Sequence, residues 1–134
     1  MPADASDNDA VLARLDRLNE LLFARDPAIV DEMWSGPGFR LIGSELGEVA
    51  ATREDLARLL IGLFTRPARL SWQWHTRIVE RHGDVAWLFA EGELLVTHAD
   101  RVDRSPYRAV CVFRLDAGRW VWRLFCGSEP AAPV

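Results

Sequence analysis

The stretch LSWQWHTRIVERHGDVAWLFAEGELLVTH, residues 70–98, decides the fold that this sequence predicts. On both sides of Gly83-Asp84, apolar, aromatic and β-branched residues alternate with polar ones. Such alternation is typical of β-strands, and a Gly-Asp dipeptide between two of them favours a tight turn. The stretch therefore predicts one long antiparallel hairpin, and we expect the rest of the chain to pack on it or to extend it.

The two strands of this hairpin differ in how their faces are composed. Residues 70–82 predict a polar face and a mainly apolar face, and the apolar one would carry Leu70, Trp72, Trp74, Thr76 and Ile78. Residues 85–90, in the second strand, are apolar on both faces. A strand of that kind is typically covered on both sides. We therefore expect one face of the second strand to lie in the core and the other face to be covered as well.

Three helices are expected before the hairpin. Leucines recur at helical spacing after Asp7, which is expected to cap the first helix. Asp26-Pro27 predicts the start of a short second helix that ends at Trp34, because proline suits the first helical position. Thr52, with Asp55 three residues later, resembles a capping box. It opens a third helix whose apolar stripe consists of Leu56, Leu59, Leu60, Leu63 and Phe64.

The remaining strands complete an α+β architecture. Short strands are expected at residues 39–42 and 48–50, and long strands at residues 107–115 and 119–126. Helices followed by a run of antiparallel strands indicate the α+β class and not alternating βαβ units. Three helical stripes can cover only one face of the sheet, while two of the long strands are apolar on both. Because monomers rarely expose so large an apolar patch, we expect a homodimer through the open sheet face.

Composition narrows the class of protein. The 134 residues suffice for one domain, expected at residues 7–130, with flexible termini at 1–6 and 131–134. A net charge of −4 argues against nucleic-acid binding. No signal-like or membrane-spanning segment is evident, so a cytoplasmic location without membrane association is the default expectation. Cys111 and Cys126 are not spaced as a redox or metal pair, and we predict neither a metal nor a cofactor.

Several short motifs resemble those of one known family. They are Gly83-Asp84-Val85-Ala86-Trp87 with Ala90-Glu91, Arg108, Gly118-Arg119-Trp120, and Gly127-Ser128-Glu129-Pro130. Together they make residues 7–130 similar to the SnoaL-like group of the nuclear transport factor 2-like superfamily. The resemblance implies a cone, in which a strongly curved, mixed or antiparallel sheet wraps around three N-terminal helices and a pocket opens at one end. Members of the superfamily include polyketide cyclases, ketosteroid isomerases, epoxide hydrolases, dehydratases and non-catalytic association domains.

Glu91 is the candidate catalytic residue. The isomerase-type members use an aspartate on a strand as their base, but no aspartate lies within a predicted strand here. Glu91 and Glu93 lie in a mostly apolar strand, and both share a face with Trp87 if the strand is regular. A carboxylate in an apolar cone has a raised pKa and can act as acid or base. The alternative is that these residues mark where the strand meets water, or pair with Arg108.

Aromatic residues are the candidates for a pocket wall. We predict that Trp34, Trp72, Trp74, Tyr107 and Cys126 line the cone, with plain core packing as the alternative for each. An aromatic-lined cone suits a flat, apolar ligand. The leading interpretation is therefore a small-molecule-binding protein, with acid–base turnover of a small apolar or aromatic substrate left open. The competing interpretation is a non-catalytic module for dimerisation or partner binding, whose cone is filled by its own side chains.

Overall fold

The computed structural model describes residues 5–134, and the side chains of residues 7–134. Residues 1–6 were predicted to form a flexible N-terminus, and residues 1–4 of this segment lie outside the described part of the chain. Residues 131–134 form no helix or strand. The elements along the chain are α1 (Ala5–Ala24), the 3-10 helix η1 (Pro27–Glu32), β1 (Arg40–Ile42), β2 (Val49–Ala50), α2 (Arg53–Phe64), β3 (Arg69–His82), β4 (Val85–Thr97), β5 (Val102–Asp116) and β6 (Arg119–Ser128).

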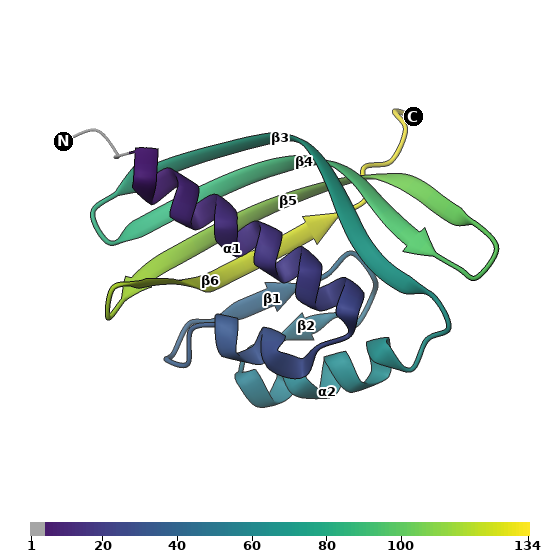
Figure 1. Cartoon of the computed structure of the whole chain (residues 1–134), viewed down its shortest axis with the longest axis horizontal. Helices are drawn as coiled ribbons and strands as arrows, with labels where there is room; N and C mark the ends of the chain where they lie inside the picture. The colour runs from purple at the N-terminus through teal and green to yellow at the C-terminus, as the bar shows by residue number, and fades with distance from the viewer. Residues whose placement is uncertain (1–4) are drawn as a thin grey trace.

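The strands form one mixed sheet in the order β2-β1-β6-β5-β4-β3 (Figure 1). The long hairpin β3–β4 pairs antiparallel from Arg69 opposite Thr97 to His82 opposite Val85. β5 and β6 continue the antiparallel order, while β1 runs parallel to β6. The predicted α+β class, the hairpin and the mixed, curved sheet are confirmed.

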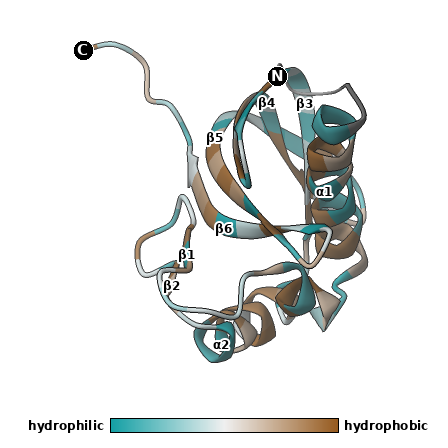
Figure 2. Ribbon diagram, turned by 90° about the vertical axis from the view of Figure 1, so that its left-hand side faces the viewer, coloured by the Kyte–Doolittle hydropathy of each residue, from teal (hydrophilic) through white to brown (hydrophobic). Residues whose placement is uncertain are grey.

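The helices cover one face of this sheet, which we call the inner face. α1 crosses the inner face of β3 to β6, and α2 lies beside β1 and β2 at one end (Figures 1 and 2). The side of α1 that meets the sheet is fully apolar and consists of Val11, Leu15, Leu18, Leu21 and Leu22, all buried. This periodic stripe anchors the helix, because burying each such side chain contributes about 1.5–3 kcal/mol. No helix in residues 5–134 is long and apolar enough to cross a membrane.

Two of the three predicted helix starts are confirmed. The Asp26 carboxylate accepts from Ala28 N–H at 2.9 Å, and the Thr52 hydroxyl accepts from Asp55 N–H at 3.0 Å. The prediction for Asp7 is wrong, because α1 already begins at Ala5. The Asp7 carboxylate instead pairs with the Arg81 guanidinium of β3, so it ties the first turn of α1 to the sheet.

A β-bulge in β3 overturns the predicted faces of that strand. The register shifts between Trp74 and Thr76, which inserts one extra residue and inverts the alternation beyond it. Thr76 and Ile78 therefore lie on the outer face, away from α1, and the prediction that they share a face with Trp72 is wrong. The opposite position of β4 is Gly92, where an added Cβ would lie 2.0 Å from the Gln73 carbonyl oxygen. Glycine is required here because the two backbones approach so closely.

Candidate functional site

A cavity of about 290 Å³ opens at the end of the sheet where α2, the β1–β2 loop and the start of β3 meet. Its wall is mainly apolar and is built by Leu18 and Leu22 of α1, Ile29 of η1, Leu41 of β1, Leu56, Leu59, Leu60 and Leu63 of α2, Leu70 and Trp72 of β3, Leu94 and Val96 of β4, and Phe125 of β6. These residues come from helical stripes and inner strand positions that belong to the core or pack against it, and they also border the cavity at this end. The sequence thus leaves an apolar hollow where the sheet curves away from the helices.

The amide of Asn19 fixes Trp72 at the edge of the sheet. β3 is an edge strand, so every second residue presents unpaired backbone groups. The Asn19 side chain accepts from Trp72 N–H at 2.8 Å and donates to the Trp72 carbonyl at 2.9 Å. The indole of Trp72 is thereby held in the pocket wall, where it stacks on Trp74 and contacts Phe125, with ring centroids 5.6 Å apart in both pairs.

Tyr107 contributes a buried phenol to this wall. Tyr107 lies in β5 opposite Gly92 and is only 4% exposed. A Cβ at Gly127 of β6 would lie 1.8 Å from the phenolic oxygen, so only glycine leaves room for this ring position. Burial raises the pKa of Tyr107 well above its usual range, while hydrogen bonding to Ser44 acts in the opposite direction. The phenol is therefore neutral at physiological pH and can donate a hydrogen bond.

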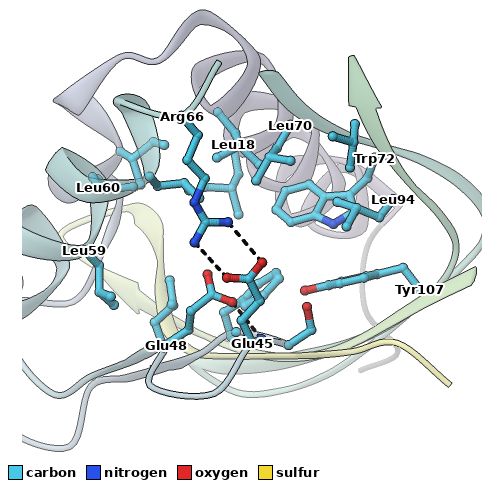
Figure 3. A pocket seen from close by; sticks show the side chains of 18 of the residues that line it. Leu18, Glu45, Glu48, Leu59, Leu60, Arg66, Leu70, Trp72, Leu94 and Tyr107 are labelled. Atoms are coloured by element: carbon cyan, nitrogen blue, oxygen red, sulfur yellow. Dashed lines mark hydrogen bonds and ion pairs between the residues drawn. The ribbon is translucent and has the colours of Figure 1, made fainter. Parts of the chain in front are cut away.

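An ion pair bridges the mouth of the cavity. The Arg66 guanidinium, just after α2, donates to both carboxylate oxygens of Glu45 in the β1–β2 loop, at 3.0 and 2.8 Å (Figure 3). Hydrogen bonding to Arg66 holds the pKa of Glu45 below its usual value. The backbone at Arg66 is fixed in turn, because Arg25 at the end of α1 donates to the carbonyls of Arg66 and Ala68 at 2.6 and 3.0 Å. The bridge therefore links the β1–β2 loop to both helices.

Glu48 is a second carboxylate at the mouth. One of its oxygens accepts from Glu45 N–H at 2.7 Å, which closes the β1–β2 loop. The side chain folds over Gly43, where a Cβ would lie 2.8 Å from Glu48 atoms. In the described part of the chain, Glu48 forms no ion pair with an arginine or histidine. Its carboxylate lines the pocket, and its charge, like that of Glu45, raises the pKa of the Arg66 guanidinium.

The structure brings two of the predicted pocket residues, Trp72 and Tyr107, together in the pocket wall. Trp74 packs behind them, against Trp72 and Tyr107, and does not line the cavity. Trp34 lies elsewhere, in a separate hollow of about 230 Å³ beside the β5–β6 turn. Its indole lies under the Arg114 guanidinium, 4.3 Å from the ring centroid. Cys126 pairs with Val110, an outer-face position, and is likewise absent from the pocket lining.

The structure places Glu91 on the outer face of the sheet. It is exposed, and its partner across the β4–β5 ladder is Arg108. Glu91 does share a face with Trp87, as predicted, but that face points away from α1 and the cavity. The assumption that this face lines the cone is wrong, because the inner positions of β4 are Ala86, Leu88 and Ala90, all buried. A catalytic role for Glu91 stays a prediction that this geometry does not favour.

Sequence reasoning missed the polar residues of the mouth: Ser44, Glu45, Glu48, Arg66 and Glu129. The sequence predicts short strands at residues 39–42 and 48–50 and assigns no site role to the residues between them. The signal that was available is the pair Glu45 and Glu48, within and directly after the segment bounded by Gly43 and Gly47. The structure also shows no cluster of three or more potential metal-ligating side chains in its described residues.

Comparison with known proteins agrees with the fold of the chain. The chain matches the SnoaL-like domain family over residues 11–130. No curated protein matches it.

Similar solved structures cover nearly the whole chain. A dehydratase candidate of the nuclear transport factor 2-like family from Streptomyces avermitilis has a TM-score of 0.81 at 15% identity, covering 95% of this chain and 98% of that one. A Pseudomonas putida protein of the same superfamily and of unknown function gives 0.81 at 12% identity, covering 98% and 92%. A Catenulispora acidiphila protein in complex with S-DNPA gives 0.81 at 15% identity, covering 94% and 95%. At these identities the likeness establishes the fold alone.

Proposed function

This chain belongs to the SnoaL-like domain family, and we propose that its pocket binds a small, mostly apolar molecule. The observation that carries the proposal is the cavity of about 290 Å³ with a wall of leucines and aromatic rings. Apolar clefts with a few polar groups are the usual form of small-molecule sites. The flat body of the ligand would lie among the leucines of α1 and α2, and its polar end would face Tyr107, Ser44 and Glu48 at the mouth.

The cavity favours ligand binding over a cone filled by its own side chains. A filled cone would need the leucines of α2 to meet Leu70 and Leu94, yet these side chains border empty space. Removing apolar area from water contributes about 25 cal/mol per Å², so a ligand that fills this space gains affinity from its whole body. The Catenulispora acidiphila protein, solved in complex with S-DNPA, offers a precedent on the same fold.

Acid–base turnover in this pocket is the finer proposal. The neutral phenol of Tyr107 and the carboxylate of Glu48 line the same cavity, so a donor and a base are both available to one ligand. We therefore assign the base to Glu48 in place of Glu91. Tyr107→Phe and Glu48→Gln should each lower kcat by at least about tenfold on any substrate identified, as expected for acid–base groups.

Binding is tested with 2-(2-naphthyl)ethanol, a neutral bicyclic probe, by isothermal titration calorimetry. We expect saturable binding to the native protein. Leu59→Trp should abolish it, because a larger side chain at this position fills the cavity. The matched control is Ile61→Trp, two residues along α2, where the native side chain is 68% exposed and outside the pocket. Equal binding by both variants would overturn the proposal.

We also propose a homodimer through the outer face of the sheet. Ile78, Val85, Trp87 and Val110 are exposed there, and apolar area of this kind is typical of an interface. Charges on the same face are divided, since β3 and β4 carry Glu80, Glu91 and Glu93, while β5 carries Arg104, Arg108 and Arg114. A two-fold axis that lies between the two sheets and runs parallel to the strands would bring the acidic strands of one copy over the basic strand of the other.

Sedimentation equilibrium at tens of micromolar chain tests the dimer. The native protein should sediment as a dimer. Trp87→Glu should yield monomers, because a charge replaces an exposed apolar side chain of this face, whereas Ile61→Glu on α2 should leave the dimer intact. A native monomer at this concentration would rule out the dimer without affecting the pocket proposal.

A further inference from the structure

The mouth of the cavity carries an excess of negative charge. Three carboxylates line it, those of Glu45, Glu48 and Glu129, against a single guanidinium, that of Arg66. Arg66 is committed to Glu45, which it binds through both carboxylate oxygens. Glu129 accepts only from the Ser105 hydroxyl, at 3.1 Å, among the hydrogen bonds of the described residues. Three carboxylates against one guanidinium give the mouth a net formal charge of −2, although Arg66 also interacts with the charge of Glu48.

The carboxylates of Glu48 and Glu129 line the same cavity as the buried phenol of Tyr107. Their negative charges raise the pKa of Tyr107, in addition to the larger effect of burial. In Figure 3 the phenolic oxygen of Tyr107 points into the cavity, and the carboxylates of Glu45 and Glu48 lie across from it, toward Arg66. A ligand whose body lies among the leucines would therefore place its polar end between them.

Aromatic faces beside the carboxylates favour the same kind of group. Trp72, Tyr107 and Phe125 line the cavity, and Trp72 lies within 6 Å of both of the other rings, measured between centroids. The face of an aromatic ring attracts a cation, most strongly when the cation is shielded from water. Next to an apolar wall, the attraction between opposite charges is also stronger than in water.

We propose that the ligand of this pocket is an amine: an apolar body with a protonated nitrogen that binds Glu48 at the mouth. This inference rests on the proposed binding function and adds the charge of the ligand to it. An ammonium group offers N–H donors to the Glu48 carboxylate and its charge to the ring faces. An anionic ligand of the same shape would meet the net negative charge of the mouth and would be rejected.

Three probes share the same bicyclic ring system and differ in charge, so they separate the effect of ligand charge on affinity from the effect of ligand shape. They are 2-(2-naphthyl)ethylamine, 2-(2-naphthyl)ethanol and 2-naphthylacetate, titrated into the whole protein at pH 7 and low salt. The amine should bind about tenfold more tightly than the alcohol, and the alcohol about tenfold more tightly than the acetate. In Glu48→Gln the preference for the amine over the alcohol should fall to about twofold or less. Binding of the alcohol also shows that the variant is folded.

Glu54→Gln is the matched control, because Glu54 is an exposed glutamate in the first turn of α2 outside the pocket. It removes the same charge and should preserve the native order of the three probes. If the acetate bound as tightly as the amine, or if Glu48→Gln kept the full preference, the amine inference would be wrong while pocket binding stood. If none of the three probes bound, both the pocket proposal and the inference would fall.

Discussion

The two halves of the β3–β4 hairpin lie on either side of the bulge between Trp74 and Thr76, and they have different surroundings. In the half near the turn, Ala86 and Leu88 are buried in the core, at most 1% exposed. In the other half, Leu94 and Val96 occupy the same inner face but border the cavity. The same alternating sequence thus builds a closed core on one side of the bulge and a binding site on the other.

The charged residues repeat this difference. At the closed end Glu32 is buried and pairs with two arginines, Arg14 at 3.2 Å and Arg119 at 2.8 Å. At the open end, Glu45 pairs with Arg66 alone and both side chains are about half exposed. At the closed end two arginines surround one glutamate, and at the open end glutamates outnumber the arginine. The negative charge of the carboxylates is therefore compensated in the packed end and only partly compensated at the cavity.

The largest expected effect comes from one truncation made in both halves. Leu88→Ala should lower the free energy of unfolding by about 3 kcal/mol, because it leaves a cavity in a packed core. Leu59→Ala, at the pocket wall, should cost less than about 1.5 kcal/mol, since its side chain already borders empty space. Urea unfolding of the two variants measures both values. Equal losses would mean that the pocket end is packed as tightly as the closed end.

Gly127→Ala tests the fit of Tyr107 into the open half. A Cβ at this position would lie 1.8 Å from the phenolic oxygen, so the ring must move, and we expect a loss of about 2 kcal/mol. In a Tyr107→Phe background the oxygen is absent, so the same substitution should cost about 1 kcal/mol less. A double-mutant cycle by thermal or urea unfolding gives this coupling. Additive effects would show that Tyr107 is not held against Gly127.

The closed half was predictable from the sequence because its signals are local. The alternation in residues 85–90, the turn at Gly83-Asp84 and the leucine stripe of α1 each follow from the spacing of neighbouring residues. The structure confirms the hairpin, the α+β class and two of three helix caps from such patterns. Family resemblance added the curvature of the sheet, which no local pattern indicates.

The open half was not predictable in the same way, because its features depend on contacts between distant residues. The bulge after Trp74 lies where Gly92 on another strand approaches closely, and it places Thr76 and Ile78 on the face opposite to the one predicted. The ion pair at the mouth joins Glu45 to Arg66, which are 21 residues apart. Trp72 and Tyr107 were predicted from residue type, whereas Glu48 opened a predicted short strand, residues 48–50, to which no site role was assigned.

Asn19→Ala tests how much the hydrogen bonds from Asn19 to the Trp72 backbone contribute to stability, apart from the packing of α1. It removes two hydrogen bonds to the Trp72 backbone, and we expect a loss of about 1.5 kcal/mol, since a single such bond contributes about 1 kcal/mol. Glu20→Ala, at the next and exposed position of α1, should cost less than about 0.5 kcal/mol. If both substitutions had the same effect on stability, the amide of Asn19 would have no special role at the edge of β3.

The smallest expected effect is that of Glu45→Gln at the mouth. The ion pair with Arg66 is half exposed, so its loss should cost only about 0.5 kcal/mol, and less at high salt. Hydrogen bonding to Arg66 lowers the pKa of Glu45 in the folded state. Its contribution is therefore fully present above the usual value of 4.5 and is lost as pH falls through the lower folded value. Urea unfolding at pH 7 and at pH 3 should show the native protein and the variant converging in acid.

That convergence distinguishes the two ends of the molecule. The Glu45–Arg66 pair holds the β1–β2 loop over the cavity, so acid or salt should free the loop before it unfolds the core. Hydrogen exchange at the amides of residues 43–48 should then rise in Glu45→Gln at pH 7, while that of Leu88 in the closed half stays unchanged. Faster exchange throughout the sheet would show instead that the ion pair stabilises the whole fold, and that the two ends do not open independently.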